Sequence, residues 1–191
     1  MNISKLNIVL GSQSPRRKEL LEKMGLSFEV IVTNVDESYD PLMDPKDVAE
    51  FLSNKKATAL VPRLGPDQVG ITADSIVVLD EKIYEKPLDE NDAFRILSQL
   101  SGKTHTVYTG VTIINKSKRV SFTDETLVHM LPMNDSEIRY YIENYKPYDK
   151  AGSYGIQDWV GVCKVGKIEG SYPTVMGLPV HRVYNRLQEF L

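Results

Sequence analysis

Residues 8–17 read Ile-Val-Leu-Gly-Ser-Gln-Ser-Pro-Arg-Arg, and this stretch decides the fold of the N-terminal part of the chain. Its three leading apolar residues, two of them β-branched, predict a buried strand. Ser14 is a favourable helix N-cap, and Pro15 is a favourable first helical residue because proline loses no hydrogen bond there. We expect the helix to continue to Met24 and to stop at Gly25. A strand therefore leads through a short hydroxyl-rich turn into a helix.

The start of this predicted helix carries two adjacent arginines, Arg16 and Arg17. Free backbone N–H groups and the helix dipole favour an anion at a helix N-terminus. Arginines at that end oppose the dipole and cost helix stability, which a bound phosphate would offset. The stretch therefore indicates a phosphate site. A solvent-exposed basic helix start is an equally good interpretation of these residues alone.

The composition limits the classes of function. The chain has 191 residues, 41% of them hydrophobic, which predicts a single domain over residues 1–191, with room for two lobes. Its formal net charge of −3 provides no general basic field for nucleic acid or for an anionic membrane. The single cysteine, Cys163, cannot form an intrachain disulfide and favours a reducing compartment. Neither a signal peptide nor an apolar run near the ~20 residues of a membrane span is visible, so we expect a cytoplasmic protein.

Two acidic residues stand in notable places. Asp74 lies between the β-rich runs 69–72 and 76–79. A buried carboxylate is costly unless it meets a cation, a metal ion or hydrogen-bond donors. A residue that caps a turn at a strand end is the simpler alternative. Glu37 follows a strand predicted over residues 28–32, in a polar loop where acidic residues are common.

The next predicted helix carries two adjacent lysines. Asp44 and Pro45 form a second cap-and-proline start, and the apolar spacing up to Ala59 is helical. Lys55 and Lys56 follow each other on this helix, so their side chains point about 100° apart. Only one of them is expected to face a site.

The rest of the chain gives further elements and few chemical signals. Helices are predicted over 89–100, from Asn134 onward and over 180–187. Strands are predicted as a long strand that ends at Ile114 and as strands over 120–131 and 159–165. Gly102-Lys103-Thr104 is not a phosphate-binding P-loop, because the glycine required five residues earlier is Leu97. The three histidines lack the spacing of metal ligands.

A second group of informative residues surrounds Tyr154. Small residues on both sides of it allow a close backbone approach, and Gln157 carries an amide that can both donate and accept at the edge of a nucleobase. A turn with a buried tyrosine is the alternative interpretation.

Several motifs, in order along nearly the whole chain, resemble those of the Maf family of nucleoside triphosphate pyrophosphatases. They are Ser12–Leu21 for S-x-S-P-R-R-x-x-L-L, Lys56-Ala57 for K-A, Ala73-Asp74-Ser75 for A-D-T, Lys86-Pro87 for K-P, Ser101–Gly110 for S-G-x-x-H-x-V-x-T-G, Ala151–Gln157 for A-G-x-Y-G-I-Q, and Gly177-Leu178-Pro179 for G-L-P. The chain departs from these motifs at Ser75, at Glu85, where the family often has glycine before the K-P pair, and at Ser153.

The resemblance implies an α/β fold like that of the Maf and ITPase proteins, with a mixed elongated sheet flanked by helices and an active-site cleft between two lobes. It also implies hydrolysis between the α- and β-phosphates of a nucleoside triphosphate. The implied catalytic residues are Asp74 as the base for water, Glu37 near the phosphates, and Arg17 and Lys86 as cations. Glu37 and Asp74 would hold a divalent cation, Mg²⁺, Mn²⁺ or Co²⁺. The implied substrate-binding residues are Ser12, Ser14, Arg16, Lys56, Ser75 and Gln157, while Lys55 is expected to face solvent.

The resemblance also indicates which base is preferred. Subfamilies that prefer pyrimidine nucleotides have Arg, Thr and Gln at the positions of Arg16, Ser75 and Gln157, and Ser75 keeps the hydroxyl. We therefore expect dTTP and UTP to be the preferred substrates, in a role that cleans the nucleotide pool, and a homodimer is compatible with the family. The competing hypothesis is a non-catalytic nucleotide or nucleic-acid binder in the control of cell division and septum formation. That hypothesis predicts loss of Asp74 or a basic face beyond the site.

Overall fold

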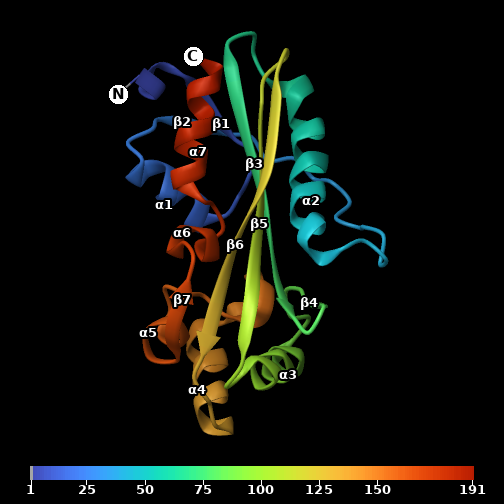
Figure 1. Ribbon diagram of the computed structural model, residues 1–191, viewed down its shortest axis with the longest axis vertical. Coiled ribbons are helices and arrows are strands. Elements are labelled where there is room, and N and C mark those ends of the chain that lie inside the picture. Colours follow the sequence, from blue (N-terminus) through green and yellow to red (C-terminus); the bar gives the residue numbers. More distant parts are fainter. Residues whose placement is uncertain (1) are drawn as a thin grey trace. The chain divides into compact units, whose positions relative to one another are not determined.

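The structure, a computed structural model, describes residues 2–191 and contains a mixed seven-stranded sheet with helices beside it (Figure 1). The strands run in the order β2-β1-β3-β5-β6-β7, and β4 pairs with β3. The chain divides into two compact units. The first contains the residues up to Asp74 with Thr109–Asp124 and Gly177–Leu191, and the second contains Ser75–Tyr108 and Glu125–Met176. The mixed α/β class expected from the sequence is confirmed.

The first unit begins with two strand–helix–strand crossovers. β1 (Asn7–Leu10) pairs in parallel with β2 (Phe28–Val30) and with β3 (Gln68–Leu79). The helix α1 (Pro15–Lys23) connects β1 to β2, and α2 (Pro45–Leu60) connects β2 to β3. Because the chain moves outward from β1 to β2 and then back past β1 to β3, right-handed crossovers place the two helices on opposite faces of these strands, as Figure 1 shows.

The carboxyl ends of β1 and β2 meet at one edge of the sheet, level with Ile71 of β3. Leu10 on β1 lies between Val30 on β2 and Ile71 on β3. The loops after β1 and β2 leave from this edge, and β3 continues beyond it toward Asp74. An edge of this kind, where the strand order reverses, is where open α/β sheets bind ligands.

Helix starts confirm the expectations from the cap residues. The side chain of Ser14 accepts from the N–H of Arg17 at 3.5 Å, and that of Asp44 accepts from the N–H of Lys46 at 3.1 Å. Proline follows both caps as the first helical residue. Asn134 forms a reciprocal capping box at the start of α4.

The remaining elements complete the two units. The other strands are β4 (Lys82–Tyr84), β5 (Thr104–Ile114), β6 (Arg119–Met130) and β7 (Val165–Glu169), and the other α-helices are α3 (Glu90–Leu100), α4 (Asp135–Tyr145), α5 (Trp159–Cys163), α6 (Tyr172–Met176) and α7 (Val180–Leu187). Short 3₁₀ helices span Asn2–Lys5, Val61–Arg63, Pro147–Asp149, Ala151–Ser153 and Gln188–Phe190. Among residues 2–191, no helix combines the length and apolarity that a membrane crossing requires.

The predicted strand over residues 159–165 is wrong. Trp159–Cys163 forms the short helix α5, and strand structure begins only at Val165. Val160 is fully buried whereas Val162 is 75% exposed, which is incompatible with a strand that buries every second side chain. A short apolar run does not distinguish these two structures by its pattern.

A close contact sets the position of α2 on the sheet. A Cβ atom added to Gly110 of β5 would lie 2.2 Å from the carbonyl carbon of Ala49 on α2, so only glycine allows this approach. The buried side chains of Ala57 and Leu60 on the same helix pack against Val9 of β1. The helix that carries the two adjacent lysines is therefore held close to the sheet.

We predict that Gly110→Ala lowers the free energy of unfolding by about 3 kcal/mol, because α2 must move away from the sheet. Urea unfolding followed by circular dichroism measures the change. Gly65→Ala is the matched control, since its added Cβ would meet only the flexible side chain of Gln68, at 3.4 Å. Equal effects of the two substitutions would contradict the prediction.

Candidate active site

Hydroxyl groups organise the loop between β1 and α1. The N–H of Gly11 donates to the carbonyl of Ile71 at 2.8 Å and so continues the pairing of β1 with β3. The Oγ of Ser12 accepts from the N–H of Ser14 at 3.2 Å and from Nη1 of Arg17 at 3.1 Å. Ser12 is buried, and its contacts bring the arginine back over the loop. The predicted phosphate-site residues Ser12, Ser14 and Arg17 are therefore brought together.

Arg17 is held at both ends of its guanidinium. Besides the contact with Ser12, its Nε donates to the carbonyl of Gly177 at 2.8 Å. Burial lowers the pKa of Arg17, and the nearby positive charge of Arg16 acts in the same direction, while the charges of Asp74 and Glu37 raise it. Because arginine stays protonated in proteins, Arg17 is a cation whose charge interacts with both carboxylates. Its contact with Gly177 gives it a structural role that the sequence did not predict.

Lys56 of α2 lies between the two predicted acidic residues. Its Nζ is 2.8 Å from Oε1 of Glu37 and also forms an ion pair with Asp74. The side chains of Lys56 and Asp74 are only 12% and 14% exposed, whereas that of Glu37 is 48% exposed. Two carboxylates, each on its own segment, thus meet at one ammonium group.

Asp74 lies inside a continuous strand. β3 runs without interruption from Gln68 to Leu79, so the interpretation of Asp74 as a cap on a turn is wrong. Ala73 and Ile76 on either side are buried. The partly buried carboxylate is compensated by the cation of Lys56, which is one of the partners that its position in an apolar strand requires.

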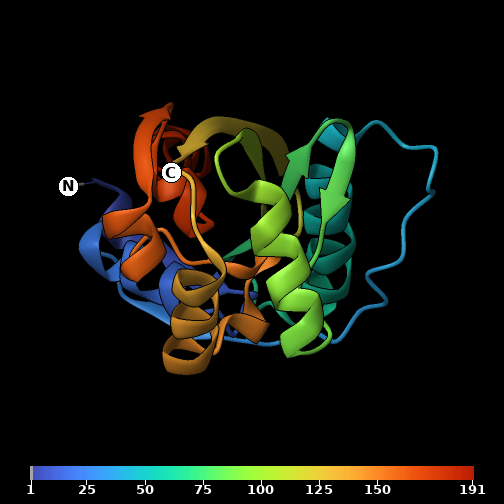
Figure 2. The ribbon, with the colours of Figure 1, turned by 90° about the horizontal axis from the view of Figure 1, so that it is seen from below.

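The expectation that Lys55 faces solvent is met only in part, because its side chain is 30% exposed and also contacts the loop after β2. Its Nζ donates to the carbonyl of Ser38 at 2.9 Å and lies 3.7 Å from Oδ2 of Asp36. Both adjacent lysines therefore contact the loop of residues 31–44, which passes along the outer side of α2 in Figure 2.

The second unit holds the predicted residues Ser75, Lys86 and Gln157. Ser75 is half-buried on β3, and Lys86 is exposed after β4. The N–H of Gly152 donates to the carbonyl of Glu85 at 3.2 Å, which joins the segment before Lys86 to the segment that leads to Gln157. Glu85 is not among the described residues with positive φ, so its backbone does not need the glycine that the family often has there.

The turn that carries Gln157 is closed by a buried tyrosine. The hydroxyl of Tyr141 accepts from the N–H of Gly155 at 2.9 Å and donates to Oδ2 of Asp158 at 2.9 Å. The N–H of Asp158 donates to the carbonyl of Gly155 at 3.0 Å. Gln157 is exposed while Gly155 and Ile156 are buried, so the turn presents this amide outward.

Each of the three histidines contacts another side chain of the protein. Burial lowers the pKa of His105 to about 4, and its Nε2 lies 2.7 Å from the hydroxyl of buried Tyr154. His129 contacts Thr104 and Glu169, and His181 lies near Asp124. In residues 2–191 no group of three or more His, Cys, Asp or Glu side chains could hold a metal ion by itself.

Comparison with known proteins identifies the family. The profile of the family described as Maf-like protein matches residues 7–190. The chain belongs to the Maf family. A dTTP/UTP pyrophosphatase of Porphyromonas gingivalis is 45% identical to this Maf protein over 99% of the chain and 96% of the relative. A dTTP/UTP pyrophosphatase of Parabacteroides distasonis is 43% identical over 99% of the chain and 98% of the relative.

Among solved structures, a dITP/XTP pyrophosphatase from Mycobacterium abscessus covers 96% of this chain and 93% of its own, with a TM-score of 0.42 and 10% identity. This likeness is too weak to bear on the fold of the Maf protein.

The contacts of four residues were not predicted from the sequence: those of Lys55 and Gly177 in the first unit and those of Tyr141 and Asp158 in the second. Each acts through a contact with a residue that is distant in the sequence or through a backbone carbonyl. Only Gly177 carried a signal, because it opens the closing G-L-P motif.

We predict that Arg17→Ala lowers the free energy of unfolding by about 2 kcal/mol, because hydrogen bonds of a charged group to Ser12 and Gly177 are lost. Urea unfolding measures the change. Lys18→Ala on the same helix removes the same charge and is the control. An unchanged free energy for Arg17→Ala would show that the contact with Gly177 contributes nothing to stability.

Proposed function

We propose that this Maf protein hydrolyses nucleoside triphosphates, preferentially dTTP and UTP, to a nucleoside monophosphate and pyrophosphate. Relatives with 43–45% identity over nearly the full length carry the name dTTP/UTP pyrophosphatase. The observation that carries the proposal is the meeting of Glu37 and Asp74 at Lys56, beside the guanidinium of Arg17. Cations and carboxylates gathered at the carboxyl ends of parallel strands are what phosphoryl chemistry requires.

In the proposed reaction, water attacks the α-phosphorus and the bond from that phosphorus to the bridging oxygen breaks. Asp74 accepts the proton of the attacking water, and pyrophosphate leaves with the bridging oxygen. Arg17 and Lys56 stabilise the negative charge on the phosphate oxygens, and Lys86 has the same role in the proposal because it occupies the K-P motif. Removing one such donor typically costs about 10²–10³ in kcat.

The arrangement suits a divalent cation. Mg²⁺ is commonly held by one or two carboxylates together with substrate phosphates, and Glu37 and Asp74 form such a pair because both contact a single ammonium group. In the proposal these two residues hold Mg²⁺, Mn²⁺ or Co²⁺, which would neutralise charge on the triphosphate. Lys56 would then turn from the carboxylates to the phosphates.

Gln157 carries the proposed selection of the base. Its amide can both donate and accept, which matches the alternating acceptors and donor on the edge of uracil or thymine. A wrong base leaves polar groups unpaired, so discrimination through such contacts can be large. In the proposal, Ser12 and Ser14 of the loop after β1 and Arg16 in the first turn of α1 bind phosphate, and Ser75 keeps the hydroxyl of the pyrimidine pattern.

The competing hypothesis, a non-catalytic regulator of cell division, predicts loss of the base or a basic face beyond the site. Asp74 is present and paired with Lys56, and the formal net charge is −3. Both features favour the enzyme. We place the reaction in the cytoplasm, where it would clean the nucleotide pool. The proposal is also compatible with a homodimer.

We predict that Asp74→Asn reduces pyrophosphate release at least a hundredfold, because the acceptor for the proton of water is lost. Turnover of dTTP in ¹⁸O-labelled water, followed by mass spectrometry, measures rate and bond cleavage together, and the label is expected in the monophosphate of the wild type. A thermal melt checks that the variant is folded. Near wild-type turnover by a folded variant, or label in pyrophosphate, would contradict the proposed roles.

We predict that kcat/KM is higher for dTTP and UTP than for GTP and 7-methyl-GTP, because Gln157 complements the pyrimidine edge. Parallel assays of pyrophosphate release with these substrates and CTP measure the preference. Gln157→Glu is expected to reduce it by lowering the values for dTTP and UTP. A wild-type preference for 7-methyl-GTP would show that the assignment of Gln157 is wrong.

A further inference from the structure

Two adjacent lysines of α2 hold the loop of residues 31–44 from different sides. Lys56 contacts the carboxylate of Glu37, and Lys55 contacts the residues immediately before and after it. The loop contains neither helix nor strand apart from a short turn, so the position of Glu37 depends on such contacts. Lys55 has no place in the reaction proposed above.

The contacts of Lys55 fix the backbone around Glu37. Its Nζ donates to the carbonyl of Ser38 at 2.9 Å and lies 3.7 Å from Oδ2 of Asp36. Asp36 in turn accepts from the N–H of Ser38 at 3.0 Å and from its hydroxyl. The three groups form a closed local network, and Glu37 is the residue that this network encloses.

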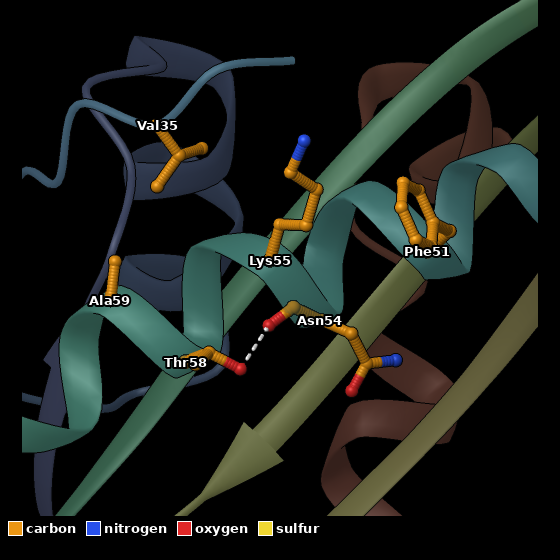
Figure 3. A pocket seen from close by; sticks show the side chains of 6 residues that line it. All are labelled: Val35, Phe51, Asn54, Lys55, Thr58 and Ala59. Carbon is orange, nitrogen blue, oxygen red and sulfur yellow. Dashed lines mark hydrogen bonds between the residues drawn. The ribbon is translucent and has the colours of Figure 1, made fainter. Parts of the chain in front are cut away.

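The stem of Lys55 is supported on both sides. It lines an apolar pocket of about 440 Å³ on the outer side of α2, where it stands between Val35 and Phe51 in Figure 3. Its Nζ lies 5.5 Å from the centre of the Phe51 ring, within the range of a cation–π contact. Its side chain is 30% exposed. These contacts restrict the rotamers of the lysine and lower the entropy that its hydrogen bond must overcome.

We infer that Lys55 is a positioning residue, which places the carboxylate of Glu37 against Lys56, the lysine that also pairs with Asp74. The inference rests on the proposed function only for the role of Glu37 in the reaction. Without Lys55, Glu37 keeps its ion pair with Lys56, but the carboxylate of Glu37 is 48% exposed, and ion pairs of exposed groups stabilise little. Small displacements of a group near the reacting atoms have large effects on rate.

The kinetic test replaces Lys55 with methionine, which keeps an apolar stem of similar length in the pocket. We expect kcat for dTTP to fall about tenfold with KM nearly unchanged, since the variant still binds the substrate but no longer holds the carboxylate of Glu37 in its position. Lys46→Met is the matched control: it removes the same charge from the same helix, where Lys46 forms a surface ion pair with the N-cap residue Asp44. Lys55→Arg should restore most of the activity.

A double-mutant cycle separates positioning from direct binding. In a Glu37→Gln background, Lys55→Met is expected to have little further effect on kcat, because the group that it positions is already altered. An undiminished effect in that background, or a rise in KM, would overturn the inference and indicate that Lys55 contacts the substrate itself.

A measurement without substrate tests the same contact. Hydrogen exchange of peptides that cover residues 33–42 is expected to be faster in Lys55→Met than in the wild type and in Lys46→Met, with exchange elsewhere unchanged. Equal exchange in all three proteins would show that Lys55 does not hold the loop. If the wild type released no pyrophosphate from any nucleotide, the proposed function would fail while this comparison still decided the role of Lys55.

Discussion

The ion pairs of Lys56 with Asp74 and Glu37 are the interaction on which the first unit depends. A carboxylate placed in the middle of an apolar strand is tolerable only with a partner, and loss of that partner would leave a partly buried charge uncompensated. The partner comes from α2, which must therefore lie close to the sheet. Gly110 makes this approach possible because a side chain there would collide with the backbone of Ala49. The packing at Gly110 and the ion pair of Lys56 with Asp74 therefore both require α2 to lie close to the sheet.

The order of the strands explains why these groups meet at one edge. β1 is central, β2 and β3 flank it in parallel, and the chain passes from one flank to the other through α2. The hydroxyl-rich loop after β1 and the loop with Glu37 after β2 both start there, and Asp74 lies on the part of β3 that extends beyond β1. Residues separated by more than thirty positions in sequence become neighbours through topology alone. The longer of the two loops, residues 31–44, contacts both lysines of α2, which support it.

The features that could be predicted from the sequence are those that depend on residues adjacent in the chain. Ser14, Asp44 and Asn134 cap their helices as expected, since a cap needs only the residues that follow it. Motifs likewise led to Asp74 and Lys56. The failures concern partners that are distant in sequence or not side chains: Arg17 donates to the carbonyl of Gly177, and Lys55 donates to that of Ser38. A carbonyl oxygen exists at every residue, so no residue type in the sequence indicates which one accepts.

The second unit supports its exposed amide by a different means. Gln157 stands on a turn closed by the hydroxyl of Tyr141, which donates to Asp158 and accepts from Gly155. Burial raises the pKa of Tyr141 far above its ordinary value, and burial lowers that of His105 to about 4, so neither ring changes its charge near neutral pH. The turn therefore keeps the same hydrogen bonds throughout the neutral range.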